Sequence, residues 1–319
     1  MINKICLAFS LLFFSAISVA DTLYITLEKD NALAVVDGET GKLLKTKKLG
    51  QRPRGLAFSK DQSLLYVAAS DDDTIQILDA VSLNIIGELP SGEDPEMFKI
   101  HPNGRLLYVS NEDDNIVTVI DLEKKSVVAE ISVGVEPEGI AISQDGKWVV
   151  NTSETTNMVH WIDPLEQSIK ENTLVDSRPR AAEFSVDNSV LFVTSEIAGS
   201  LSRIDVATKQ ITGKLHFKVP GVDKELIQPV GVLAHPNNKV LFVALGPANR
   251  VAVVDIQSME VTKYLLVGQR VWNLAFSPDL TRLYTTNGVS NDISIIDVDA
   301  LKVTRSVRVG HYPWGIAVK

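Results

Sequence analysis

Short apolar runs separated by polar turns recur along the chain from residue 21 onwards. In the copy that begins at Pro95, MFKI precedes the turn HPNG, RLLYVS precedes the loop NEDDN, IVTVID precedes the turn LEKK, and SVVAEISV ends before Gly134. Valine, isoleucine, leucine and tyrosine fill the runs, and glycine, proline, asparagine and aspartate bound them, which is typical of β-strands. From residue 21 onwards, no 12-residue segment has a convincing helical period. Each copy therefore predicts four short antiparallel strands.

Three markers repeat in the same register. An aspartate ends the third strand of each copy, a proline opens the copy, and a turn residue precedes the third strand. The aspartates are Asp37, Asp79, Asp121, Asp163, Asp205, Asp255 and Asp297; the prolines are Pro53, Pro95, Pro137, Pro179, Pro229 and Pro313, with Val271 in the remaining copy; the turn residues are Asn31, Asp73, Asn115, Asn157, Gly199, Asn249 and Asn291. The aspartates lie 42 residues apart, except for one interval of 50. A four-stranded repeat of this period predicts a propeller blade.

The two ends of the repeat array predict how the ring closes. Full copies start near residues 53, 95, 137, 179, 229 and 271. The segment 313–319 supplies one first strand, and residues 21–50 supply the other three strands of a seventh blade. We therefore expect residues 21–319 to form a single all-β domain, a seven-bladed β-propeller of four-stranded antiparallel blades. Pairing of the N- and C-terminal strands in one blade would close the ring and hide its open edge.

One insertion breaks the period. The long interval contains eight extra residues, within HFKVPGVDKELIQ between Leu215 and Pro229. This segment joins the outer strand of one blade to the inner strand of the next, and it shares a face with the loops between second and third strands. We call this the top face. Propellers usually carry ligand sites there, which makes it the expected binding face by analogy of architecture.

The N-terminus has the pattern of a secretory signal peptide. Lys4 supplies a positive charge, the run from Ile5 to Phe14 is almost wholly apolar, and Ser18 and Ala20 are small residues at the positions that a signal peptidase reads. We expect cleavage after Ala20 and export to the periplasm. An uncleaved anchor is the alternative, but the apolar run is short for a bilayer.

Composition and charge exclude several function classes. The only cysteine, Cys6, lies in the predicted leader, so residues 21–319 can form no disulfide, covalent c-type haem or cysteine-ligated cluster. The formal net charge of −9 and the lack of a basic stripe argue against a nucleic-acid partner or an anionic membrane surface. A closed ring exposes little strand edge, and we therefore expect a monomer.

The positions that flank the opening proline should ring the central channel, and they carry unlike side chains. The residues before it are Arg52, Asp94, Glu136, Arg178, Gln228, Arg270 and Tyr312, and the residues after it are Arg54, Glu96, Glu138, Arg180, Val230, Trp272 and Trp314. A purely structural repeat would not need such variety at one position. The predicted ligand or partner site on the top face consists of Arg52, Arg54, Glu96, Glu136, Glu138, Arg178, Arg180, Arg270, Trp272, His311 and Trp314.

Two interpretations of this ring of charges stay open. As a binding site, its arginines would hold a carboxylate or phosphate through paired hydrogen bonds, and its tryptophans would stack on a planar ring or a cation. As a structural feature, the charges would pair between blades, for example Arg54 with Glu96 and Glu138 with Arg180. Exposed pairs contribute only about 0–1 kcal/mol each, so stability alone explains the arrangement poorly.

Metal and catalytic chemistry have weaker signals. The loops after the second strands carry Glu28, Glu112, Glu154 and Glu196 at matched positions, which with Glu96 and Glu138 could supply oxygen ligands to Ca²⁺. Their spacing matches no known metal motif, so we assign no metal ligand. The chain contains no G-x-S-x-G elbow, GxGxxG, Walker loop or HExxH, and we assign no catalytic residue.

With the repeat in view, the chain resembles the YVTN family of β-propellers through its LYVS, LYTTN and VxVID segments. Blade-specific phrases such as NTSETTNMVHWID, RPRAAEFS, ALGPANRVAVVD, YLLVGQRVWNLAFSPD and YPWG are similar to the β-propeller proteins associated with catabolism that depends on pyrroloquinoline quinone (PQQ). The resemblance spans residues 21–319. It implies a periplasmic accessory role beside alcohol oxidation and transport, without implying that this chain binds the quinone.

The sequence therefore favours a non-enzymatic periplasmic binding protein of PQQ-dependent alcohol catabolism. Its top face would bind a protein partner of alcohol oxidation or transport, or a small ligand. We expect no resident cofactor, with PQQ or Ca²⁺ as the open alternatives. The competing function is a propeller enzyme, either a lactonase-like hydrolase or a subunit of a quinone-dependent oxidoreductase, which fold-level analogy keeps open.

Overall fold

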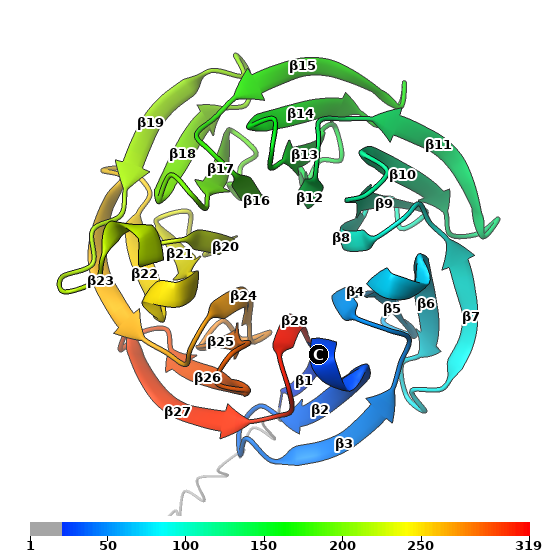
Figure 1. Cartoon of the computed structure of the whole chain (residues 1–319), viewed down its shortest axis with the longest axis horizontal. Helices are drawn as coiled ribbons and strands as arrows, with labels where there is room; N and C mark the ends of the chain where they lie inside the picture. Colours follow the sequence, from blue (N-terminus) through cyan, green and yellow to red (C-terminus); the bar gives the residue numbers. More distant parts are fainter. Residues whose placement is uncertain (1–20) are drawn as a thin grey trace, which may run out of the picture.

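The computed structural model describes residues 21–319, and the predicted leader, residues 1–20, lies outside the described residues. The chain forms seven four-stranded sheets arranged as a ring around a central channel (Figure 1). This confirms the predicted all-β, seven-bladed propeller. Within residues 21–319, no helix is both long enough and apolar enough to cross a membrane.

Each blade runs from an inner to an outer strand in chain order. The first three full blades comprise β4 (Pro53–Phe58), β5 (Leu64–Ala69), β6 (Thr74–Asp79) and β7 (Ile85–Pro90); β8 (Pro95–Ile100), β9 (Leu106–Asn111), β10 (Ile116–Asp121) and β11 (Ser126–Ser132); and β12 (Pro137–Ile142), β13 (Val149–Ser153), β14 (Met158–Asp163) and β15 (Ser168–Leu174). The next three comprise β16 (Pro179–Phe184), β17 (Val190–Ser195), β18 (Ser200–Asp205) and β19 (Ile211–His216); β20 (Pro229–Ala234), β21 (Val240–Leu245), β22 (Arg250–Asp255) and β23 (Glu260–Leu266); and β24 (Val271–Phe276), β25 (Arg282–Asn287), β26 (Asp292–Asp297) and β27 (Lys302–Arg308). Short 3-10 turns occupy Glu28–Asp30 (η1), Ser70–Asp72 (η2), Lys224–Leu226 (η3) and Gly246–Ala248 (η4).

The seventh blade closes the ring by joining the two ends of the chain. Its strands are β28 (Pro313–Val318), β1 (Thr22–Leu27), β2 (Ala32–Asp37) and β3 (Leu43–Lys48), in that order from the channel outwards. β28 pairs antiparallel with β1, with Ile25 opposite Ile316. The predicted closure is therefore confirmed.

The hydrophobic core lies between neighbouring blades. The two middle strands of each blade are almost wholly buried, whereas outer strands such as β3 are exposed. Trp161 illustrates the packing, because its ring meets Trp148 and Phe184 edge to face at 5.9 and 6.1 Å between ring centroids. Such aromatic pairs add to the free energy of burial.

The strand-ending aspartates stabilise the outer turns. The side chain of each accepts backbone N–H groups two or three residues further on, as Asp79 does from Ser82 at 2.7 Å. The same arrangement occurs at Asp37, Asp121, Asp163, Asp205, Asp255 and Asp297. These residues hold turns together and lie away from the channel, as expected for a marker that every blade repeats.

The turn marker joins each blade to the next. Asn291 has a left-handed backbone (φ 63°), and its side-chain oxygen accepts the N–H of Tyr312, the residue before the opening proline of the following blade, at 3.0 Å. The same bond runs from the residue before the proline to the marker of the preceding blade in five further pairs: Arg52 to Asn31, Asp94 to Asp73, Glu136 to Asn115, Arg178 to Asn157, and Arg270 to Asn249. Asparagine and aspartate suit this position because they tolerate the left-handed region and carry an acceptor.

Replacing Asn291 by alanine should lower the free energy of unfolding by about 2 kcal/mol, roughly half from forcing alanine into the left-handed region and half from the lost hydrogen bond. Asn291→Gly separates the two contributions, because glycine accepts the backbone conformation and loses only the bond. Urea unfolding of both variants measures the difference. Equal stability of Asn291→Ala and the unaltered protein would show that this bond does not hold the blades in register.

Candidate functional site: the mouth of the central channel

The inter-blade bond brings three sets of side chains to the top of the channel. The residues before and after the opening proline form two of them. The third set directly follows the second strand of each blade. The carbonyl of the residue before the proline accepts its backbone N–H, as Asp94 does from Glu112 at 3.0 Å and Glu136 from Glu154 at 2.9 Å. We call the resulting cluster the channel mouth. It contains Glu28, Arg52, Arg54, Asp94, Glu96, Glu112, Glu138, Glu154, Arg178, Arg180, Glu196, Arg270, Trp272 and Trp314.

One half of the channel mouth centres on Glu96. This carboxylate is 1% exposed and accepts from Arg52 at 3.1 Å and from Arg54 at 2.9 Å. Arg52 also pairs with Asp94, and Arg54 lies 3.5 Å from Glu28. Both guanidinium groups are therefore held by carboxylates from neighbouring blades.

The other half centres on Arg180, whose side chain is 12% exposed. Its guanidinium lies 2.6 Å from Glu154, 3.2 Å from Glu138 and 3.6 Å from Glu196. Arg178 pairs with Glu154 at 2.5 Å and with Glu196 at 3.2 Å. The two arginines thus share a set of buried glutamates.

Arg270 extends this half across the channel. It lies 2.9 Å from Glu196, two blades away, and donates to the side chain of Gln228 at 2.6 Å. Trp272 is stacked between Arg270 and Arg180, with guanidinium-to-ring distances of 4.3 and 5.5 Å. The mouth is therefore tied together across blades as well as between adjacent ones.

Most of the eleven predicted site residues lie in the channel mouth, and two lie beside it. Nine of them lie in the channel mouth, where the inter-blade pairs Arg54–Glu96 and Arg180–Glu138 are both formed. Glu136 lies beside them and accepts from Thr155 on its own blade. His311 lies at the rim, with its ring 2.8 Å from a carboxylate oxygen of Asp30. The tryptophans stack on the protein's own arginines, as Trp314 does on Arg54 at 5.0 Å.

Carboxyl groups outnumber guanidinium groups in the channel mouth, seven to five, and most are buried. Burial raises the pKa of Glu96 to about 7, although Arg54 offsets part of this effect. Burial likewise raises the pKa values of Glu138 and Glu154 to about 7 against the opposing effect of Arg180. All five arginines are paired with carboxylates, and the mouth carries surplus negative charge once these carboxyl groups ionise above about pH 7.

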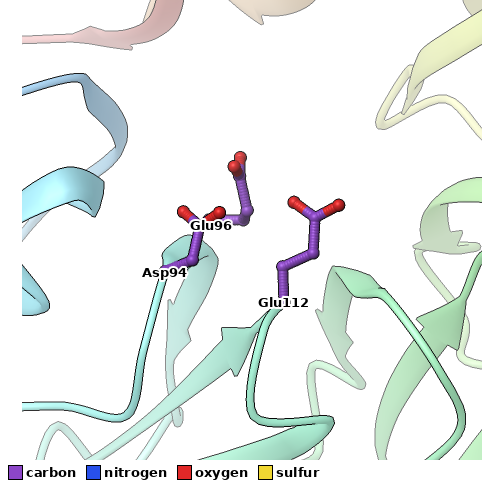
Figure 2. A group of neighbouring side chains, drawn as sticks. All are labelled: Asp94, Glu96 and Glu112. Carbon is purple, nitrogen blue, oxygen red and sulfur yellow. The ribbon is translucent and has the colours of Figure 1, made fainter.

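Glu112 is the carboxyl group of the channel mouth that has no arginine partner within residues 21–319. Asp94, Glu96 and Glu112 place carboxylate oxygens within 4.8 Å of one another, and their side chains project to the same side of the blade (Figure 2). Among residues 21–319, Glu112 has no ion pair. Burial raises its pKa to about 7, with further contributions from Glu96 and Asp94. Such a group of oxygens suits a hard cation or a protonated amine.

Two charged residues inside the channel were not among the predicted site residues. Lys99 and Glu183 line a cavity of about 150 Å³ below the mouth. Burial raises the pKa of Glu183 to about 7, and Lys99 partly offsets the effect. The repeat could have revealed both residues, because they occupy the fifth position of their first strands. The other first strands carry alanine or leucine at this position: Ala57, Ala141, Leu233, Ala275 and Ala317.

Comparisons with known proteins identify the architecture. The family model described as the Cytochrome D1 heme domain matches residues 60–164, about a third of the chain. Hydrazine synthase from Kuenenia stuttgartiensis has a similar structure, with a TM-score of 0.80 and 21% identity over 87% of this chain and 92% of that chain. A protein from Bacteroides fragilis, provisionally described as a 6-phosphogluconolactonase, has a TM-score of 0.81 and 16% identity over 96% and 99%.

Dihydro-heme d1 dehydrogenase NirN is similar over 93% of this chain and 74% of that chain, with a TM-score of 0.69 and 13% identity. A comparison of the sequence with curated proteins finds no match. At these identities the likeness shows the fold. It assigns no activity.

The channel mouth does not fit a haem. Haem carries carboxylates, which need free cations, and the five arginines of the mouth are already paired with glutamates and aspartates. An axial histidine is also lacking there: among residues 21–319, His311 is nearest the rim and is held by Asp30. The three carboxyl groups of PQQ would meet the same surplus of negative charge. We therefore derive no chemistry through either group.

Stability should fall as pH rises from about 5 to 8, because carboxyl groups with raised pKa values keep their protons when folded and lose them when unfolded. Glu112→Gln removes one such group and mimics its protonated form. We expect it to raise the free energy of unfolding by about 1 kcal/mol at pH 8, a figure reduced for partial exposure, and to change it little at pH 5.

Urea unfolding at both pH values, with a chelator present, measures the effect. Glu130→Gln, on the exposed outer strand β11, removes the same charge as a control. A stabilisation by Glu112→Gln that is equal at pH 5 and pH 8 would contradict the claim that the ionised form of Glu112 destabilises the folded protein.

Proposed function

We propose that this chain is a non-enzymatic periplasmic binding protein of PQQ-dependent alcohol catabolism that recognises a cationic group through its channel mouth. The observation that supports the binding chemistry is that each of the five arginines is paired with at least one carboxylate, whereas Glu112 has no ion pair within residues 21–319. The resemblance of the blade-specific phrases to PQQ-associated propellers supports the pathway and the compartment.

The surplus of carboxyl groups favours a positively charged ligand over an anion. An approaching anion would have to displace Glu138, Glu154 or Glu196 from the arginines, which would leave buried charges unpaired. A lysine or arginine side chain of a protein partner would instead replace a proton on Glu112. Binding should therefore release protons and strengthen as pH rises through about 7.

The network of buried ion pairs makes the mouth a rigid surface. Glu96, Glu138 and Glu154 are each at most 3% exposed, so their positions are fixed before any ligand arrives. A preorganised site loses little side-chain entropy on binding. The same pairing argues for recognition over acid–base catalysis, because Glu138 and Glu154 are both held by Arg180.

A capture experiment tests this proposal. Residues 21–319 carry a tag inserted after Leu165, an exposed turn residue at the opposite end of the blade from the mouth. Periplasmic extract from alcohol-grown cells is passed over the immobilised protein at pH 8 and low salt, and bound proteins are identified by mass spectrometry. We expect a quinoprotein dehydrogenase, its cytochrome or a transport-binding protein, released by raised salt.

The matched variants are Glu112→Lys, which reverses the unpaired charge, and Glu130→Lys, which makes the same change on the outer strand β11. Glu112→Lys should lower capture of the partner at least tenfold, and Glu130→Lys should leave it unchanged. Equal capture by both variants, or capture that strengthens at pH 6, would rule out recognition of a cation at the channel mouth.

A further inference from the structure

A second pocket lies on the top face, over the insertion that breaks the repeat. Its volume is about 600 Å³, within the range of small-molecule sites. The insertion between β19 and β20 forms most of its wall, through Phe217, Val219, Pro220, Val222 and Ile227. In Figure 1 this segment, which contains η3, is the yellow-green stretch between β19 and β20, outside the ring of inner strands. None of the residues that line the pocket belongs to the channel mouth, so the two are separate.

The insertion is held firmly in place. Phe217, Val219 and Ile227 are each at most 6% exposed and belong to the apolar core between the fourth and fifth full blades. The N–H of Phe217 donates to the carbonyl of Gly199 at 2.9 Å, and the hydroxyl of Tyr264 donates to the carbonyl of Lys218 at 2.9 Å. These contacts make the pocket a formed feature of the fold.

Gly199 lines the pocket and differs from the residue at the same position of the other blades. It stands where six blades carry asparagine or aspartate, and it has the same left-handed backbone (φ 65°). A side chain at this position would begin 3.1 Å from the carbonyl oxygen of Ile227. The loss of the usual marker side chain therefore makes room for the insertion to return to the blade.

The pocket has an apolar floor and a basic rim. Lys218, Lys224 and His216 contribute to its lining and are exposed. Within residues 21–319, the ion pairs include neither Lys218 nor Lys224. This contrasts with the channel mouth, where every arginine is paired, and with the net charge of −9 on the whole chain. Unpaired cations above an apolar floor complement an amphiphilic anion.

We propose that the insertion forms a binding site for a small amphiphilic carboxylate, a molecule with an alkyl or aromatic body and one anionic end. The body would lie against Pro220 and Val222, above the buried side chains of Phe217 and Val219, and the carboxylate would pair with Lys218 and Lys224. This site is independent of the cation site proposed at the channel mouth.

Fluorescence of 8-anilinonaphthalene-1-sulfonate tests the site, because the probe combines aromatic rings with one sulfonate and brightens in apolar surroundings. Decanoate should displace it, and decanol should displace it at least tenfold more weakly. The double variant Lys218→Glu/Lys224→Glu should raise the Kd of the probe at least tenfold, and Lys124→Glu, an exposed lysine on another blade, should not change it.

Gly199→Asn restores the residue of the other blades and tests the pocket's shape. Asparagine accepts the left-handed backbone, so the blade should fold, while its side chain crowds Ile227 and should weaken probe binding at least fivefold. Glu112→Gln should leave the probe unaffected and thus separates the two sites. Absence of probe and decanoate binding to the unaltered protein, or binding that survives both the double lysine variant and Gly199→Asn, would overturn the proposal.

Discussion

The hydrogen bond from one blade's first strand to the preceding blade's turn marker organises the channel mouth. The residue before the opening proline has a left-handed conformation, as Arg178 has where its N–H donates to Asn157, and its side chain lies at the channel mouth. Its carbonyl accepts the N–H of the residue that directly follows the second strand. One local constraint, repeated around the ring, thus gathers charges that lie more than 200 residues apart in sequence. Gly199 has no side chain to accept this hydrogen bond, and the insertion joins the two blades at that junction.

The charges gathered in this way determine which ligands the mouth can bind. Each guanidinium reaches at least one buried carboxylate, so the arginines balance charge within the protein and offer little to an anion. The balance is incomplete, and burial raises the pKa of Glu112 to about 7. Protonation relieves the surplus in the free protein, and a cation could do so in a complex. The mouth is consequently most attractive to positive charge just above neutral pH.

Sequence reasoning predicted the fold well because the repeat supplies seven independent readings of the same strand pattern. It also predicted that Arg54 and Glu96 would share the mouth, since their place beside the opening proline sets their location. It could not decide between ligand binding and ion pairing, because that depends on distances across the channel, such as Arg270 to Glu196. The sequence showed the insertion but not the pocket that it forms. The walls of the pocket come from Gly199 and from the core packing of Phe217, which the spacing of the repeat does not reveal.

The sign of the charge that the channel mouth prefers is the central claim, and a pair of short peptides tests it directly. Protein labelled with ¹³C at glutamate carboxyl groups is titrated with tetralysine and with tetraglutamate at pH 8, and the carboxyl resonances are followed by NMR. We predict that tetralysine shifts the resonances of Glu112 and Glu96, that the response weakens at pH 6, and that tetraglutamate has no effect. Binding of tetraglutamate at the mouth, with tetralysine silent, would contradict the account.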